Sequence, residues 1–159
     1  MKKLILIVFL LISVNIFAHS QYYFNVEEHE EITAEGETVF RYQAVISKDG
    51  AKWELQFPLR SESAPERSDE VLGFCTPSFE EIQNGFVMHI HWGSENWSFY
   101  EDFIFEEIDF EPKLVKIFTI YYDEQLCIKN WQEEKEINPP VKLGELTVSQ
   151  ICMYMEKEK

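Results

Sequence analysis

Short runs of β-branched and aromatic residues, each ended by a turn signal, are the feature that most restricts the fold of this 159-residue chain. In the stretch TVFRYQAVISKDGAKWELQFPL, two such runs, residues 39–47 and 52–57, flank Asp49-Gly50. An Asp-Gly pair readily adopts the positive φ angles of a two-residue hairpin turn. The stretch therefore predicts two antiparallel strands joined by a tight turn.

The same pattern continues to the end of the chain. Further turn signals are Asn84-Gly85, the GSEN of residues 93–96 and Asp123-Glu124. The spacing predicts an all-β fold, a single antiparallel meander of about eight strands forming a sandwich or barrel. Its central strands are expected between residues 86 and 122, and its last strand over roughly residues 145–155. The segment PSFEEIQ fits either one helical turn or a short strand, and SESAPERSDE is expected to be an exposed loop.

The first 20 residues have the layout of a cleaved secretory signal peptide. Lys2 and Lys3 precede an apolar run over residues 4–12, and the small residues Ala18 and Ser20 occupy the −3 and −1 positions of a cut after Ser20. The sequence thus predicts a signal peptide over residues 1–20 and a single β domain over residues 21–159.

The signal also indicates where the protein is located. Its apolar run is shorter than a membrane span, and the first cysteine, Cys75, is too far from the cut to carry a lipid, so no membrane anchor is expected. The paired lysines are typical of a bacterial signal. We expect a periplasmic protein, with secretion as the second choice. A cut after Ala18 is the alternative, and it would leave His19 as the new N-terminus.

The charge of the chain is strongly acidic. It has 29 Asp and Glu against 14 Lys and Arg, a formal net charge of −15. This excess argues against nucleic-acid binding, which needs a basic footprint, and against an anionic membrane surface. It serves solubility in any case, and it would steer a basic protein partner toward the molecule.

The stretch HIHWGSENW contains the one candidate metal site. Alternation along a strand places His89 and His91 on one face, about 7 Å apart, and leaves the opposite face to the core. The residues expected in the core are Phe86, Met88, Ile90 and Trp92. Two histidines at that spacing can bind zinc or copper if a third ligand, nominally His29 or Glu95, completes the set. The ordinary interpretation is the half-exposed polar face of an amphipathic strand.

The alternative signal cut adds a copper hypothesis. With His19 as the N-terminal residue, its amine and ring, together with His89 or His91, resemble the histidine brace of secreted copper monooxygenases, which are also β-sandwiches. The resemblance implies a bound copper ion. It covers one terminal residue and the fold class alone.

The three cysteines, Cys75, Cys127 and Cys152, show no Cys-x-x-Cys spacing. In an oxidising compartment two of them are expected to pair. If the flanks of Pro139-Pro140 form a hairpin, Cys127 lies opposite Cys152. The sequence therefore predicts a Cys127–Cys152 disulfide.

Aromatic and acidic residues supply the candidate partner-binding residues. Trp97 and Tyr100 lie near a turn, where exposed aromatics act as interface anchors, and Glu133, Glu134 and Glu136 are expected on an acidic loop. No Gly-x-Ser-x-Gly elbow, His-Glu-x-x-His pair, phosphate loop or dinucleotide fingerprint occurs in the chain. The sequence therefore favours a non-catalytic protein, and no cofactor is expected.

A small, acidic, secreted β protein of this character resembles bacterial periplasmic immunity proteins paired with type VI secretion effectors, and periplasmic lysozyme inhibitors. The resemblance implies a non-catalytic binding protein that neutralises a basic toxin or cell-wall hydrolase. The alternatives are a metal-binding envelope protein using His89 and His91, and a structural envelope component.

Overall fold

The structure is a computed structural model that describes residues 21–32, 36, 38–63 and 65–155. The predicted signal peptide, residues 1–20 with His19, lies outside the described residues. Nine strands, a 3₁₀ turn and one α-helix follow in chain order: β1 Tyr23–Ile32, β2 Thr38–Lys48, β3 Ala51–Ser61, β4 Glu70–Leu72, β5 Ser78–Ile82, β6 Gly85–Gly93, β7 Trp97–Ile108, β8 Glu111–Asp123, β9 Ile128–Lys142, η1 Leu143–Glu145 and α2 Val148–Met155.

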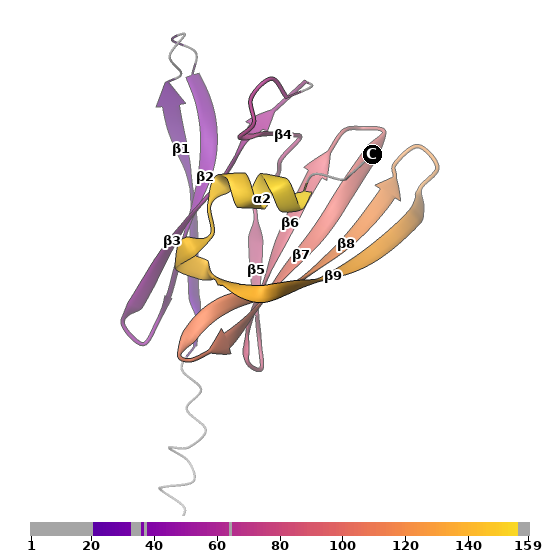
Figure 1. The fold of residues 1–159 in the computed structure, drawn as a ribbon. Helices are drawn as coiled ribbons and strands as arrows, with labels where there is room; N and C mark the ends of the chain where they lie inside the picture. Colours follow the sequence, from indigo (N-terminus) through magenta and orange to yellow (C-terminus); the bar gives the residue numbers. More distant parts are fainter. Residues whose placement is uncertain (1–20, 33–35, 37, 64, 156–159) are drawn as a thin grey trace, which may run out of the picture.

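The strands form two sheets (Figure 1). The four-stranded sheet has the order β1-β2-β3-β4, and its β3–β4 pair is parallel. The five-stranded sheet, β5 to β9 in order, is antiparallel throughout. The mostly β character is confirmed, and so is the central position of β6, β7 and β8. The prediction of one antiparallel meander is wrong, and the sheets do not close into a barrel.

The chain leaves the first sheet at Gly73. This residue has a φ of +58°, and a Cβ atom added there would lie 2.0 Å from the carbonyl oxygen of Gly93. Only glycine permits this approach between the end of β4 and the end of β6. The segment VLGFC carries no ordinary turn signal, so the change of sheet could not be read from it.

The C-terminal segment is helical, so the predicted strand over residues 145–155 is wrong. Thr147 and Gln150 form a capping box. The Thr147 Oγ1 atom accepts a hydrogen bond from the Gln150 N–H at 3.3 Å, and the Gln150 Oε1 atom accepts one from the Thr147 N–H at 2.9 Å. The box starts α2 where the apolar run ICMYM had suggested a strand.

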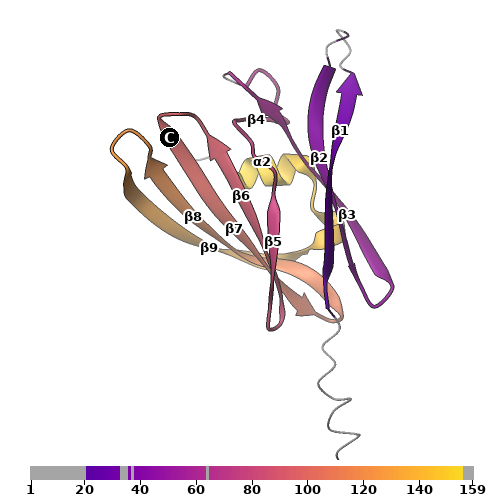
Figure 2. The same ribbon diagram turned by 180° about the vertical axis from the view of Figure 1, so that it is seen from behind.

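Helix α2 lies between the two sheets, as the front and rear views show (Figure 1, Figure 2). It buries Ile151, Cys152 and Met155 in the common core, and its Tyr154 ring lies 6.2 Å from the ring of Phe103 on β7. The expected alternation along β6 is confirmed, because its core-facing residues Phe86, Met88 and Ile90 are at most 1% exposed. The helix therefore joins the inner faces of both sheets.

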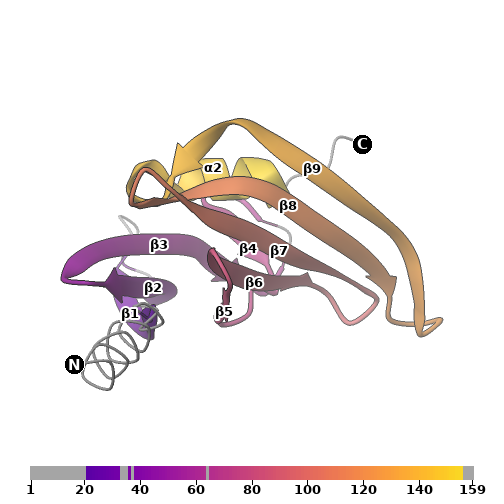
Figure 3. The ribbon, with the colours of Figure 1, turned by 90° about the horizontal axis from the view of Figure 1, so that it is seen from below.

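Strands β8 and β9 curve around α2 (Figure 3). The pairing of β8 with β9 shifts register between Leu114 and Lys116 and again between Tyr121 and Tyr122. Such irregularities increase the local twist and bend of a strand. Strand β9 continues through Pro139 and Pro140, so the hairpin predicted at these prolines does not form.

The start of β1 attaches the four-stranded sheet to the other sheet. The ring of Phe24 stacks on Phe79 at 4.9 Å, and the Tyr22 side chain lies against Phe86 at 5.1 Å. The Tyr22 hydroxyl donates a hydrogen bond to Glu107 at 3.3 Å. Burial, and then the nearby charge of Glu107, raises the pKa of the Tyr22 phenol above its ordinary value. The described chain is thus fixed in the core from its second residue.

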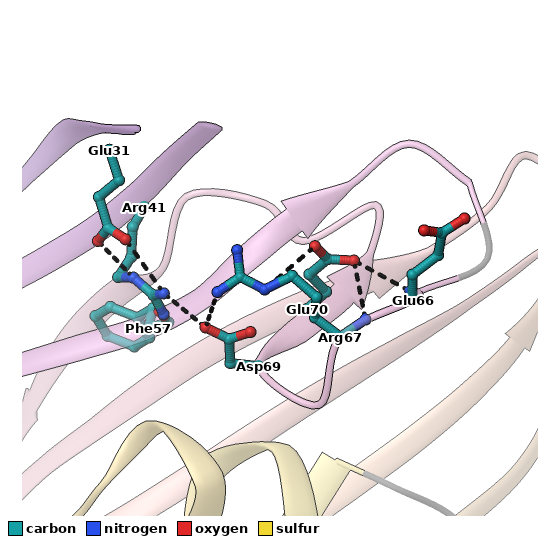
Figure 4. Close-up of polar contacts among 7 residues, drawn as sticks. All are labelled: Glu31, Arg41, Phe57, Glu66, Arg67, Asp69 and Glu70. Carbon is teal, nitrogen blue, oxygen red and sulfur yellow. Dashed lines mark hydrogen bonds and ion pairs between the residues drawn. The ribbon is translucent and has the colours of Figure 1, made fainter. Parts of the chain in front are cut away.

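A buried arginine joins the strands of the four-stranded sheet (Figure 4). The Arg41 guanidinium donates to Glu31 at 2.7 Å, to Asp69 at 2.9 Å and to the Phe57 carbonyl at 2.8 Å. That carbonyl lies beside Pro58, where the β2–β3 register shifts. Burial opposes ionisation of Asp69, but the hydrogen bond from Arg41 and the charges of Arg67 and Arg41 outweigh it and lower the pKa of the Asp69 carboxyl.

We expect Arg41→Met to lower the free energy of unfolding by about 3–5 kcal/mol, because it removes the donor of Glu31 and of the Phe57 carbonyl and leaves Asp69 with Arg67 alone. Urea denaturation measures the change. The matched control is Arg60→Met, which removes an exposed ion pair with Glu62 and should cost less than about 1 kcal/mol. Equal losses for the two variants would contradict the role assigned to Arg41.

Two tight turns differ in how clearly the sequence marks them. The predicted Asp49-Gly50 turn is confirmed, with φ angles of +51° and +83°. The β7–β8 hairpin turns through Asp109 and Phe110, with φ angles of +57° and +64°. A phenylalanine rarely adopts this conformation, so the sequence did not mark a turn there. The Phe110 side chain is 93% exposed and gains little from packing.

We expect Phe110→Gly to raise the free energy of unfolding by about 1 kcal/mol, because glycine adopts positive φ without the steric cost that phenylalanine meets. The control is Phe40→Gly in β2, a half-exposed phenylalanine in a strand, where glycine should cost about 1 kcal/mol. Urea midpoints for both variants provide the measurement. A destabilised Phe110→Gly variant would show that the turn is not strained.

Candidate functional site

The face of the five-stranded sheet that points away from α2, hereafter the outer face, collects most of the predicted site residues. Strand pairing sets three rows across it: His91, Tyr100, Ile120 and Gln132; then Ser78, His89, Asp102, Phe118 and Glu134; then Glu80, Val87, Ile104, Lys116 and Glu136. Tyr100 is 42% exposed, and the aliphatic and phenylalanine side chains of the rows are half-buried. Half-exposed apolar side chains therefore lie on a face that the core does not use.

Charged side chains interrupt this apolar surface. Asp102 lies in the middle row on the central strand β7, whereas Glu80 on β5 and Glu134 and Glu136 on β9 lie on the edge strands. His89 lies between two of these carboxylates, with its Nδ1 atom 2.7 Å from Asp102 and its Nε2 atom 3.7 Å from Glu80. At the opposite margin, the Lys116 ammonium lies 2.7 Å from Glu134 and 3.0 Å from Glu136. Within these three rows one lysine faces four carboxylates, so the rows keep a negative excess. Lys129, Lys113 and Lys142 lie in the adjoining rows of the same face.

His91 and Tyr100 form a flat aromatic pair at one end of the face. Their rings are 4.3 Å apart and inclined by only 5°. Burial lowers the pKa of His91 below its ordinary value, although the charge of Glu124 acts in the other direction. His91 is consequently held as a neutral, stacked ring at neutral pH.

The acidic residues near the C-terminus lie on a strand. Glu133, Glu134 and Glu136 were expected on a loop, but all three belong to β9, an edge strand of 15 residues. Alternation then separates them. Glu134 and Glu136 lie on the outer face with Tyr100, while Glu133 pairs with Thr119 and points to the inner face. The predicted partner-binding set is therefore divided by the sheet.

Trp97 also lies on the inner face, beside a feature that the sequence analysis did not isolate. Trp92, Phe99, Tyr121 and Trp131 are consecutive partners across β6, β7, β8 and β9 and form what we call the inner aromatic row. Trp97 meets Trp92 edge to face at 5.7 Å. Aromatic richness was visible in the sequence, but the row depends on long-range register.

The next row on the inner face contains a fully buried carboxylate, Glu101. It accepts hydrogen bonds from the Trp92 indole at 3.2 Å and from the Thr119 hydroxyl at 3.3 Å. Its neighbour across Thr119 is Glu133. A pair of carboxylates thus lies one step along the strands from the inner aromatic row.

The geometry gives little support for a metal at His89 and His91. Among the residues that the structure describes, no group of three or more His, Cys, Asp and Glu side chains is arranged to hold a metal ion. The nominal third ligands do not join the pair: His29 lies on β1 in the other sheet, and Glu95 lies in the loop after β6. His91 faces the Tyr100 ring. His19 lies outside the described residues.

The predicted Cys127–Cys152 disulfide is not formed, because the hairpin that would align the two cysteines does not exist. Cys127 is exposed in the turn before β9, where its φ is +52°, whereas Cys152 is buried in α2. Cys75 follows β4 and is half-buried. All three cysteines are described, and no two of them are joined.

The His91 environment predicts a specific pH dependence. As the pH falls below about 6.5, the unfolded chain binds a proton at His91 before the folded protein does, so the free energy of unfolding should fall. His91→Tyr keeps a ring against Tyr100 and removes this titration. Urea denaturation from pH 8 to pH 5 should show a smaller loss for the variant than for the wild type. Comparison at pH 8 corrects for packing, and parallel curves would contradict the assignment.

No protein-family model, curated protein or solved structure matches this chain. Within the described residues, no helix combines the length and the apolar character that a membrane span requires.

Proposed function

We propose that this protein is a non-catalytic binding protein that docks a basic protein partner on the outer face of its five-stranded sheet. The observation that carries the proposal is a set of half-exposed apolar side chains around the Asp102–His89 pair, with Glu80, Glu134 and Glu136 on the edge strands. Protein interfaces usually combine apolar side chains with charged groups at their edges. The rows are built on regular strands, so the surface is presented without prior rearrangement.

Tyr100 is the expected anchor of this interface. It is exposed, yet its ring is fixed by the stack on His91, so little side-chain entropy is lost on binding. Tyrosines in such positions account for a large share of binding energy. Phe118 and Ile120, on the neighbouring strand, extend the apolar area beside it.

The class of partner follows from charge and expected location. The signal peptide predicted over residues 1–20 directs the chain to the bacterial envelope, where basic toxins and basic cell-wall hydrolases act. The net charge of −15 and the acidic rim favour a cationic surface on the partner. An immunity protein or inhibitor that neutralises such an enzyme is the function that these features support best.

The test is capture of a partner from cell-envelope extract by the tagged domain, followed by association kinetics with the captured protein. We expect a basic toxin or hydrolase that is released by high salt. The double variant Glu134→Gln/Glu136→Gln should slow its association about three- to tenfold at low salt, because rim charges steer the encounter.

The matched control removes the same charge from the other sheet. Glu28 and Glu30 are exposed carboxylates on β1, and Glu28→Gln/Glu30→Gln should leave the association rate nearly unchanged. Equal slowing by the two double variants would show that net charge acts without a specific face. Capture of no basic protein, from extracts of the same strain and of competitors, would remove the proposal.

A further inference from the structure

The inner aromatic row brings together most of the tryptophan of the protein. The chain has four tryptophans, and Trp92, Trp97 and Trp131 gather at one end of the five-stranded sheet, while Trp53 lies on β3. The rings of Trp92 and Phe99 stack at 4.5 Å, and those of Tyr121 and Trp131 stack at 6.1 Å. The row is therefore made of nearly parallel ring pairs on adjacent strands.

This row differs from the core farther along the same strands. The inner-face residues near α2, such as Phe103 and Met88, are fully buried, whereas Trp131 is 37% exposed and Trp92, Trp97 and Tyr121 are half-buried. Packing alone does not require three large indole side chains at a partly exposed position. Their partly exposed rings offer aromatic surface to a ligand.

Negative charge lies next to these rings. Glu133 is two residues from Trp131 on the same face of β9, about 7 Å along the strand. Glu101 lies two residues from Phe99 on β7 and is fully buried. The Trp92 indole donates a hydrogen bond to the Glu101 carboxyl group, which fixes the orientation of the ring. The exposed carboxylate of Glu133 favours a cation beside the aromatic rings.

We propose that the inner aromatic row binds an arginine side chain presented by a peptide or protein segment. A guanidinium is planar, stacks on aromatic rings and still donates N–H groups from its edge. Here its plane lies over the Tyr121 and Trp131 rings, and its edge points toward Glu133. The site is on the opposite face of the sheet from the outer face and does not depend on the function proposed for that face.

The chemistry favours arginine over other ligands. Lysine carries a compact charge without a face to stack, so it uses the carboxylate and less of the row. A neutral polar ligand, such as a sugar, can stack on the rings and donate hydroxyl hydrogen bonds to Glu133, but it gains no attraction between opposite charges. A cation over tryptophan gains most where water is partly excluded, as it is beside Phe99 and Glu101.

The experiment is a titration of the ¹⁵N-labelled mature domain with a tri-arginine peptide, followed through the indole N–H signals. The signals of Trp92, Trp97 and Trp131 should shift together and saturate, while that of Trp53 stays in place. The control ligand is a tri-citrulline peptide, which has the same shape without the charge, and it should bind at least tenfold more weakly.

Two exposed glutamates provide matched variants. Glu133→Gln should weaken tri-arginine binding about fivefold, whereas Glu28→Gln, which removes an exposed carboxylate from β1 in the other sheet, should leave it unchanged. Trp131→Leu should weaken binding at least tenfold, and an unchanged Trp53 signal in that variant shows that the fold is kept.

Three results would overturn the proposal. The first is peptide binding that saturates without shifting the indole N–H signals of Trp92, Trp97 and Trp131. The second is equal binding of the arginine and citrulline peptides, which would indicate a platform for neutral ligands. The third is an equal effect of Glu133→Gln and Glu28→Gln, which would indicate diffuse charge attraction. None of them bears on the basic partner expected at the outer face.

Discussion

The burial of one face of the five-stranded sheet is the constraint on which the rest of the structure depends. The strands that form this face are longer than helix α2, which covers it. Strand β8 has 13 residues and is about 43 Å long, whereas α2, with 8 residues, is about 12 Å long. The helix and the four-stranded sheet cover the inner face around Met88, Phe103 and Ile117. Beyond them, the sheet has to fill its inner surface with its own large aromatic side chains.

The outer face follows from the same strands. Alternation along β7 places Phe103 and Phe105 in the core. Ile104, which lies between them, and Tyr100 and Asp102, which precede them, therefore point outward. The outward set is more apolar than solubility requires. Its carboxylates interrupt the apolar surface. The four-stranded sheet has a supporting role: Arg41 ties its strands together, and its first strand packs on β5 and β6. One strongly curved sheet thus presents two chemically different surfaces.

Local signals in the sequence predicted local structure well. The Asp49-Gly50 hairpin, the buried alternation of Phe86, Met88 and Ile90, and the central place of the strands between residues 86 and 122 are confirmed. The C-terminal strand was wrong because apolar content outweighed the Thr147 and Gln150 capping box, which the sequence also contains. The β7–β8 turn carries a phenylalanine where glycine or asparagine is usual, so no turn signal in the sequence predicted it.

The division into two sheets and the two candidate sites could not be predicted from the sequence for a physical reason. Which residues share a face depends on register between distant strands, and β8 shifts its register against both neighbours. A one-residue slip exchanges the faces. Tyr100, Glu134 and Glu136 were named as partner-binding residues, but nothing local separates them from Trp97 and Glu133, which point to the other side.

The central claim is that a basic partner docks on the outer face, and hydroxyl-radical footprinting of the complex tests it most directly. The account predicts that the partner protects Tyr100, Phe118 and His91, while the exposed aromatics Tyr23 and Phe40 of the four-stranded sheet remain as reactive as in the free protein. Protection of Tyr23 and Phe40 with Tyr100 still reactive would contradict the account and place the interface on the other sheet.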